Sequence, residues 1–246
     1  MGCKQMDVYR AKVLNQLLGC STVAVDVYGS AFPEPKRENP EHIHEAFEHM
    51  NALLCDPVHL REFLSHYLYE AAARLKASPN RVGVLGFCFG GGCVMEMVRA
   101  GLPLVAAVSF HGVVDAKPLT NLQGKPPPPM QSQPSPGRPA NGVHILVCTG
   151  RADPLVPPSM VHELQLEMDR APAIGSLQIQ VYAPNVVHAF TTPNRGESNG
   201  IVGFSSTASR FAWTSAFDTF ALAFGLRGPT PQVPPEFFQP QQTSFL

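Results

Sequence analysis

The chain has 246 residues and a formal net charge of −1, from 18 basic and 19 acidic side chains. Apolar residues make up 44% of it and charged residues 15%, well below the roughly 25% charge of an average globular protein. The balanced charge argues against a surface that binds nucleic-acid phosphates. The most apolar stretch, residues 104–114, is too short to cross a bilayer. We therefore expect a protein with a sizeable core that binds neither nucleic acid nor a membrane.

The start of the chain and the cysteines suggest where the protein works. No apolar segment of the kind that directs secretion follows Met1. The six cysteines form no C-x-x-C pair and no dense framework, which is typical of reduced thiols. We expect a cytoplasmic protein in which one cysteine is available for chemistry.

The 25 prolines concentrate in residues 123–142 and 228–246. Neither segment can form a helix interior or a central strand, because proline lacks the N–H donor. We expect one domain over residues 1–227 that carries a proline-rich surface loop at 123–142. The remaining residues, 228–246, are expected to form a disordered tail.

The rest of the sequence alternates between helical and β-strand patterns in chain order. An amphipathic helix is predicted at 7–18, and the β-branched run at 22–27 predicts a buried strand. Helices follow at 40–54 and 57–77, then a strand at 82–87 and a helix at 90–100. Further strands are predicted at 104–110, 144–149 and 177–182, with helices at 158–170 and 206–224. This alternation predicts an α/β fold of three layers: a mostly parallel sheet with helices on both faces.

Residues 86–90, Gly-Phe-Cys-Phe-Gly, lie where the strand at 82–87 gives way to a helix. They have the form of the nucleophile elbow G-x-S-x-G, with cysteine in place of serine. Cys88 would then stand at a helix N-terminus, where free N–H groups favour the thiolate. The alternative is a buried cysteine in a glycine-rich turn. Nucleotide-binding motifs do not fit, because G-x-G-x-x-G is not matched and no lysine follows the glycines.

An acid and a histidine follow two later strands. Asp153 lies on the loop that follows the strand at 144–149, and His188 lies on the loop that follows the strand at 177–182. The order Cys88, Asp153, His188 is the order of nucleophile, acid and base in α/β-hydrolases. Because all three follow parallel strands, we expect them to meet at one edge of the sheet. Taken singly, Asp153 could be a turn former before proline and His188 a surface residue.

The other histidines suggest no metal site, since the three at 42, 44 and 49 lack the spacing of converging ligands. His111 ends a predicted central strand, and we expect it to shape the same edge of the sheet.

Four segments together resemble the dienelactone hydrolase family: 86–91, 109–112, 150–154 and 188–190. The resemblance extends from about residue 8 to about residue 224. It implies hydrolysis of a small-molecule ester or lactone by a thiolate nucleophile, without a metal or organic cofactor. It places the catalytic triad on Cys88, His188 and Asp153, and an oxyanion-stabilising N–H on Phe89.

The chain departs from this family in two places. The family's opening strands, and a loop that supplies a second oxyanion donor, have no counterpart here, so we expect an N-terminally truncated version of the fold. Thr192 stands where family members specialised for dienelactone carry an arginine that binds the substrate carboxylate. An alternative function is therefore a catalytically impaired or inactive hydrolase-like protein that acts as a binding module.

Overall fold

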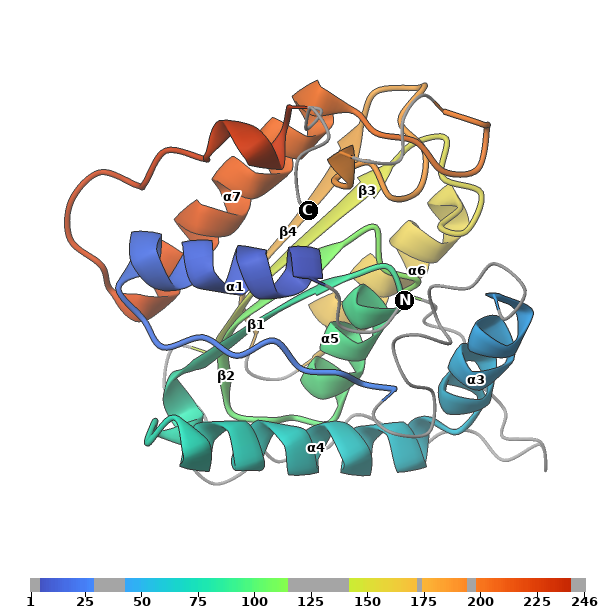
Figure 1. The fold of residues 1–246 in the computed structure, drawn as a ribbon. Helices are drawn as coiled ribbons and strands as arrows, with labels where there is room; N and C mark the ends of the chain where they lie inside the picture. Colours follow the sequence, from blue (N-terminus) through green and yellow to red (C-terminus); the bar gives the residue numbers. More distant parts are fainter. Residues whose placement is uncertain (1–4, 29–42, 115–141, 172–173, 194–197, 240–246) are drawn as a thin grey trace.

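A computed structural model describes residues 5–28, 43–114, 142–171, 174–193 and 198–239. Its centre is a sheet of four strands in the order β1-β2-β3-β4, and each neighbouring pair is parallel. The strands are β1 (Val82–Phe87), β2 (Leu104–Phe110), β3 (Val143–Gly150) and β4 (Ile174–Tyr182). The helices are α1 (Gln5–Leu18), α3 (Ile43–Cys55), α4 (Pro57–Arg74), α5 (Phe89–Arg99), α6 (Pro158–Asp169) and α7 (Ser206–Phe224). The predicted three-layer α/β fold is confirmed (Figure 1).

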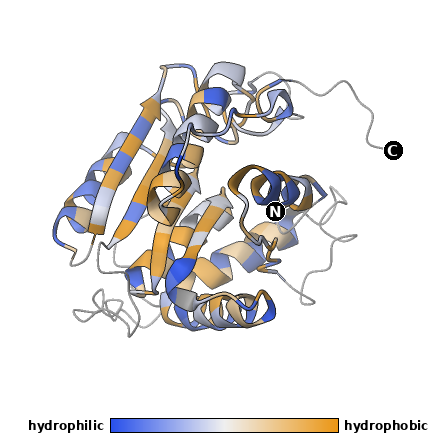
Figure 2. Ribbon diagram, turned by 90° about the vertical axis from the view of Figure 1, so that its left-hand side faces the viewer, coloured by the Kyte–Doolittle hydropathy of each residue, from blue (hydrophilic) through white to orange (hydrophobic). Residues whose placement is uncertain are grey.

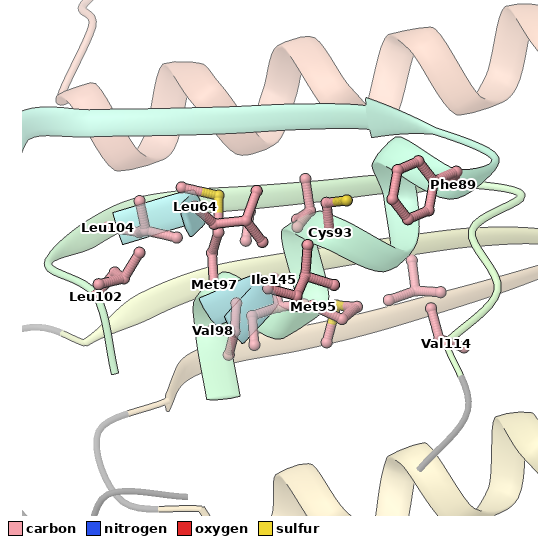
Figure 3. Close-up of a cluster of buried hydrophobic side chains, with 14 of the residues drawn as sticks. Leu64, Phe89, Cys93, Met95, Met97, Val98, Leu102, Leu104, Val114 and Ile145 are labelled. Carbon is pink, nitrogen blue, oxygen red and sulfur yellow. The ribbon is translucent and has the colours of Figure 1, made fainter. Parts of the chain in front are cut away.

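Helices cover both faces of the sheet because its central strands are apolar on both sides. Along β3, Ile145 and Val147 pack with α4, α5 and α6, whereas Leu146 and Cys148 pack with α1 and α7. All of β2 is buried. Figure 2 shows these strands as the hydrophobic interior between more hydrophilic helices. Figure 3 shows the α5 side, where Met97 and Leu64 meet.

Ion pairs also join the helices on the α5 side. The Glu96 carboxylate accepts from Arg61 at 2.7 Å and from Arg99 at 2.5 Å. Arg99 in turn donates both to Glu167 of α6, at 2.7 and 2.8 Å, and to the carbonyl of Val114 at 3.4 Å. These charges are largely buried, and each needs its partners to offset the cost of leaving water. The network therefore fixes how α4, α5 and α6 sit against one another.

The strand predicted at residues 22–27 does not form. The segment follows α1 as a coil (Figure 1), and no strand among the described residues pairs with β1 on its outer side. Val23 is 51% exposed and Val25 38% exposed, so the β-branched residues are not buried in a sheet. A strand needs a neighbouring strand for its N–H and C=O groups, and the sheet that the described residues form does not include this segment. The prediction was wrong because β-propensity alone does not supply a partner.

The C-terminal segment differs from the expected disordered tail. Pro235–Phe237 forms a short 3-10 helix, and Phe237 is buried against Trp213 with ring centroids 4.3 Å apart. The Ser209 hydroxyl donates to the Phe237 carbonyl at 2.6 Å, and Tyr9 of α1 donates to Glu236. Residues up to 239 therefore complete the core between α1 and α7. Most of the proline-rich loop predicted at 123–142, and residues 240–246, lie outside the described residues.

The turn between β1 and α5 is the tightest feature of the sheet edge. A Cβ atom on Gly86 would lie 2.0 Å from the backbone oxygen of Gly90, so only glycine allows this approach. A Cβ on Gly90 itself would meet nothing within 4 Å. The first position of the motif therefore requires glycine for steric reasons, and the last does not. Between them, Cys88 has φ 54° and ψ −121°, a strained conformation for a side chain with a Cβ.

No helix among the described residues is long and apolar enough to cross a membrane.

The docking of the C-terminal segment can be tested with Phe237→Ala. Removing a buried phenyl ring costs about 3 kcal/mol, which corresponds to a Tm lower by roughly 6–12 °C in a chain of this size. Phe211→Ala in α7 is the matched control, because Phe211 is half exposed. Thermal unfolding should separate the two variants, and equal Tm values would show that Phe237 contributes no core packing.

The two glycines of the turn make a second matched pair. Gly86→Ala should destabilise the fold by about 3 kcal/mol or more, because backbone atoms must separate. Gly90→Ala should change stability by less than about 1 kcal/mol, since its new methyl group enters open space and alanine suits a helix. Urea unfolding of both variants measures this, and an equal loss of stability would contradict the close approach of strand and helix at Gly86.

Candidate active site

The carboxyl ends of all four strands lie at one edge of the sheet. Phe87 of β1 pairs with Phe110 of β2, which pairs with Cys148 of β3, and Gly150 pairs with Tyr182 of β4. The segments that follow these strands therefore begin side by side. They carry the residues that the sequence analysis selected, at 88, 111, 153 and 188.

Cys88 is the N-cap of α5 and is partly buried. Its own N–H donates to the Phe110 carbonyl at 3.0 Å and to Nδ1 of His111 at 3.2 Å. The N–H of Phe89, the next residue, interacts with the Cys88 sulfur and favours its thiolate, which lowers the pKa of the thiol. That N–H therefore lies beside the Cys88 sulfur.

Asp153 and His188 meet across 35 residues of chain. Nδ1 of His188 lies 2.8 Å from Oδ2 of Asp153, and both side chains are buried. The other carboxylate oxygen accepts the N–H of Leu155 at 2.9 Å. Neighbouring backbone holds the histidine in place, because the His188 N–H donates to the Ile201 carbonyl and its own carbonyl accepts from Gly203. Asp153 is thus a histidine partner in addition to a turn former, and His188 is not a surface residue.

Cys88 and His188 stabilise each other's charged forms. Burial disfavours the thiolate, but the hydrogen bond and positive charge of His188, with the Phe89 N–H, lower the pKa of Cys88 below its ordinary value. Burial likewise disfavours the imidazolium, but Asp153 and then Cys88 raise the pKa of His188 to about 9. Nε2 of His188 is buried and has no partner with ordinary hydrogen-bond geometry among the described residues. The structure therefore brings His188 and Asp153 into contact, and it places Cys88 where the positive charge of His188 lowers the pKa of the thiol.

Other cysteines differ from Cys88 in this respect. Burial is the main cause that raises the pKa of Cys93 to about 12 and of Cys148 to about 12. Buried thiols without a cationic partner are poor nucleophiles. The five cysteines that the structure describes are all free.

Two further residues belong to this edge and were not predicted. The hydroxyl of Thr191 lies 2.9 Å from Nε2 of His111, and Arg10 of α1 donates to the Thr191 carbonyl at 2.7 Å. Arg10 also stacks over the Phe87 ring, 4.1 Å from its centroid. The sequence held one indication that Arg10 is buried: it stands three residues before Val13 and so lies on the same, buried face of the helix. Thr191 offered no such signal.

The described residues contain no group of three or more His, Cys, Asp or Glu side chains that would hold a metal ion.

Comparison with known proteins places this arrangement in a family. The model of the dienelactone hydrolase family matches residues 7–224. A crystal structure of a dienelactone hydrolase-like promiscuous phosphotriesterase, P91, from metagenomic libraries is 27% identical, with a TM-score of 0.70. That match covers 91% of this chain and 83% of the other. A structure named m3DLH is 25% identical over 91% of this chain and 82% of its own, with a TM-score of 0.69.

A search of curated proteins found no match. The family model nevertheless covers most of the chain, including the elbow and the Asp153 and His188 segments. The chain belongs to the dienelactone hydrolase family, and its fold is that of the α/β-hydrolases.

Proposed function

We propose that this protein hydrolyses a small carboxylic ester or lactone, with Cys88 as nucleophile, His188 as general acid and base, and Asp153 as the residue that orients His188. The observation that carries the proposal is the buried contact between Nδ1 of His188 and Oδ2 of Asp153, 2.8 Å long, at the sheet edge where Cys88 begins α5. The lowered pKa of Cys88 and the raised pKa of His188 are consistent with it. A thiolate at the N-terminus of α5 is the reactive form of cysteine. Membership of a hydrolase family supports the reaction class.

The first half of the reaction forms a thioester. The Cys88 sulfur attacks the carbonyl carbon, and the carbonyl electron pair moves onto oxygen, where the Phe89 N–H donates to it. As the tetrahedral intermediate collapses, the bond to the leaving oxygen breaks. His188 supplies the proton that this oxygen needs, because at neutral pH its raised pKa keeps it protonated.

The second half releases the acid. His188, now neutral, removes a proton from a water molecule that attacks the thioester carbonyl. The second intermediate collapses with Cys88 as the leaving group, and the thiolate is restored. Asp153 keeps Nδ1 protonated throughout through its 2.8 Å contact, so Nε2 is the nitrogen that exchanges protons.

The alternative of an inactive binding module has weaker support. A fold retained only for binding would have no need of a buried His188–Asp153 pair, or of a cysteine whose pKa is lowered against the effect of burial. Position 192 is a threonine and not the arginine that would bind a substrate carboxylate. This argues only against a carboxylate-bearing dienelactone as the substrate.

Phosphotriesters are a second candidate class of substrate. The observation that favours them is the similarity to P91, which is described as a promiscuous phosphotriesterase. A neutral phosphotriester presents a phosphoryl oxygen in place of the carbonyl oxygen, and the same thiolate and Phe89 N–H could act on it.

The proposal is tested by assaying Cys88→Ala on three substrates: p-nitrophenyl acetate, dihydrocoumarin and diethyl p-nitrophenyl phosphate. The variant should lose about 10³-fold or more in kcat/KM on the ester and the lactone, since no other group replaces the nucleophile. Mass spectrometry of the quenched wild type should show an acyl group on Cys88. Cys93→Ala, the same substitution at a buried position of α5, should keep its activity.

Retained ester hydrolysis by Cys88→Ala would overturn the proposal. Turnover of the phosphotriester alone, lost in Cys88→Ala, would instead favour the second candidate.

The pH dependence of thiol alkylation tests the ion pair without any substrate. The pKa of Cys88 is lowered and the pKa of His188 is raised to about 9, so the thiolate and the imidazolium coexist at pH values between these two pKa values. Iodoacetamide should therefore modify Cys88 at pH 6 faster than it modifies an ordinary thiol. Exposed Cys55 is the internal reference and should react much more slowly. Asp153→Asn removes the main support of the imidazolium and should slow alkylation of Cys88 at pH 6 at least about threefold. Equal rates for Cys88 and Cys55 in the wild type would contradict the ion pair.

A further inference from the structure

The backbone N–H of Cys88 has an unusual second acceptor. It donates to the Phe110 carbonyl at 3.0 Å, which continues the β1–β2 pairing, and also to Nδ1 of His111 at 3.2 Å. This N–H therefore points toward the residues that end β2. The side chain of His111 is one of the groups that fix this orientation.

The contacts of His111 define which nitrogen carries its proton. Nδ1 accepts the Cys88 N–H, so it has no proton of its own. In the neutral ring the proton is then on Nε2, which donates to the Thr191 hydroxyl at 2.9 Å. Thr191 is itself held by Arg10, which donates to its carbonyl at 2.7 Å. A continuous set of hydrogen bonds therefore runs from α1 to the elbow.

The surroundings keep His111 neutral. Its ring is fully buried and packs edge-on against His188, with centroids 5.0 Å apart, and against Phe190, at 5.4 Å. Burial, the positive charge of His188 and the positive charge of Arg10 together hold the pKa of His111 well below its ordinary value. A protonated ring would have no lone pair on Nδ1 and would release the Cys88 N–H.

We propose that His111, with Thr191 behind it, is a positioning residue for the hydrolysis proposed above: its Nδ1 holds the Cys88 backbone so that the sulfur stays beside the Phe89 N–H. The expected effect on kcat rests on the proposed hydrolysis. The placement of the Cys88 thiol can be tested separately through its alkylation rate, which needs no turnover. The partners of the two ring nitrogens of His111 are the Cys88 N–H and the Thr191 hydroxyl. The loss of His111 should therefore reduce kcat with little change in KM, because the geometry of attack depends on it.

Two amide substitutions separate the roles of the two ring nitrogens. In His111→Asn the amide can place an oxygen near the position of Nδ1, whereas in His111→Gln the longer side chain reaches toward Thr191 and leaves the Cys88 N–H without its second acceptor. We expect kcat on p-nitrophenyl acetate to fall about tenfold in His111→Gln and by less than about threefold in His111→Asn. The iodoacetamide rate of Cys88 at pH 6 should follow the same order, and urea unfolding checks that both variants are folded.

His111 has φ 40°, a conformation that asparagine tolerates better than glutamine. His111→Gly separates this backbone effect from the hydrogen bond, because glycine accepts the conformation but offers no acceptor. It should behave like His111→Gln. Activity as high as that of His111→Asn would overturn the proposal, as would a wild-type kcat in His111→Gln.

Substitution of Thr191 gives an independent test if the His111 variants do not fold. Thr191→Val removes the hydroxyl at nearly constant shape and should lower kcat about threefold or more, whereas Thr191→Ser should retain it. Equal kcat values for the two would overturn the proposal. If the wild type hydrolyses no ester, the proposed function fails, and the alkylation rates of the same variants still decide whether His111 positions Cys88.

Discussion

The turn that joins β1 to α5 is the constraint on which the site depends. Cys88 has φ 54°, which costs roughly 1–3 kcal/mol for a residue with a side chain, so the surrounding structure must hold it there. Gly86 allows the helix to approach the strand, and the Cys88 carbonyl accepts the N–H of Gly91 at 2.9 Å. The result is a partly buried cysteine at the start of a helix, at the carboxyl edge of the sheet. A turn with ordinary backbone angles would avoid the strain energy at Cys88, but it would not hold the cysteine in this position.

The two buried histidines beside Cys88 differ in charge because their hydrogen-bond partners differ. His188 and His111 lie with ring centroids 5.0 Å apart, and burial disfavours the charged form of both. His188 has the carboxylate of Asp153 at one nitrogen, which helps to more than offset burial, and its pKa rises to about 9. His111 has a hydroxyl and a backbone N–H as partners and faces two positive groups, so its pKa falls. One ring is therefore suited to exchanging protons and the other to holding a backbone still.

Sequence patterns predicted those features whose signal is local. The strands at 82–87 and 104–110 and the helix at 206–224 have the predicted bounds, because alternation and helical periodicity are properties of consecutive residues. The order of Cys88, Asp153 and His188 was also visible, since each follows a strand. The failed strand at 22–27 and the contact of Arg10 with Thr191, 181 residues apart, depend on distant neighbours, and no local pattern records these.

The helices α1 and α7 pack against the face of the sheet that carries Phe87, the residue before Cys88. Trp213 of α7 contacts Phe110 with ring centroids 5.0 Å apart, Phe87 at 5.8 Å and Phe237 at 4.3 Å. Phe87 directly precedes Cys88, and the Arg10 guanidinium lies over the rings of both Phe87 and Trp213. Because interiors are close-packed, a shift of α1 or of the C-terminal segment must be accommodated by these rings. Arg10 of α1 and Phe237 of the C-terminal 3-10 helix, both far from Cys88 in sequence, therefore share one packed layer with the strand that precedes it.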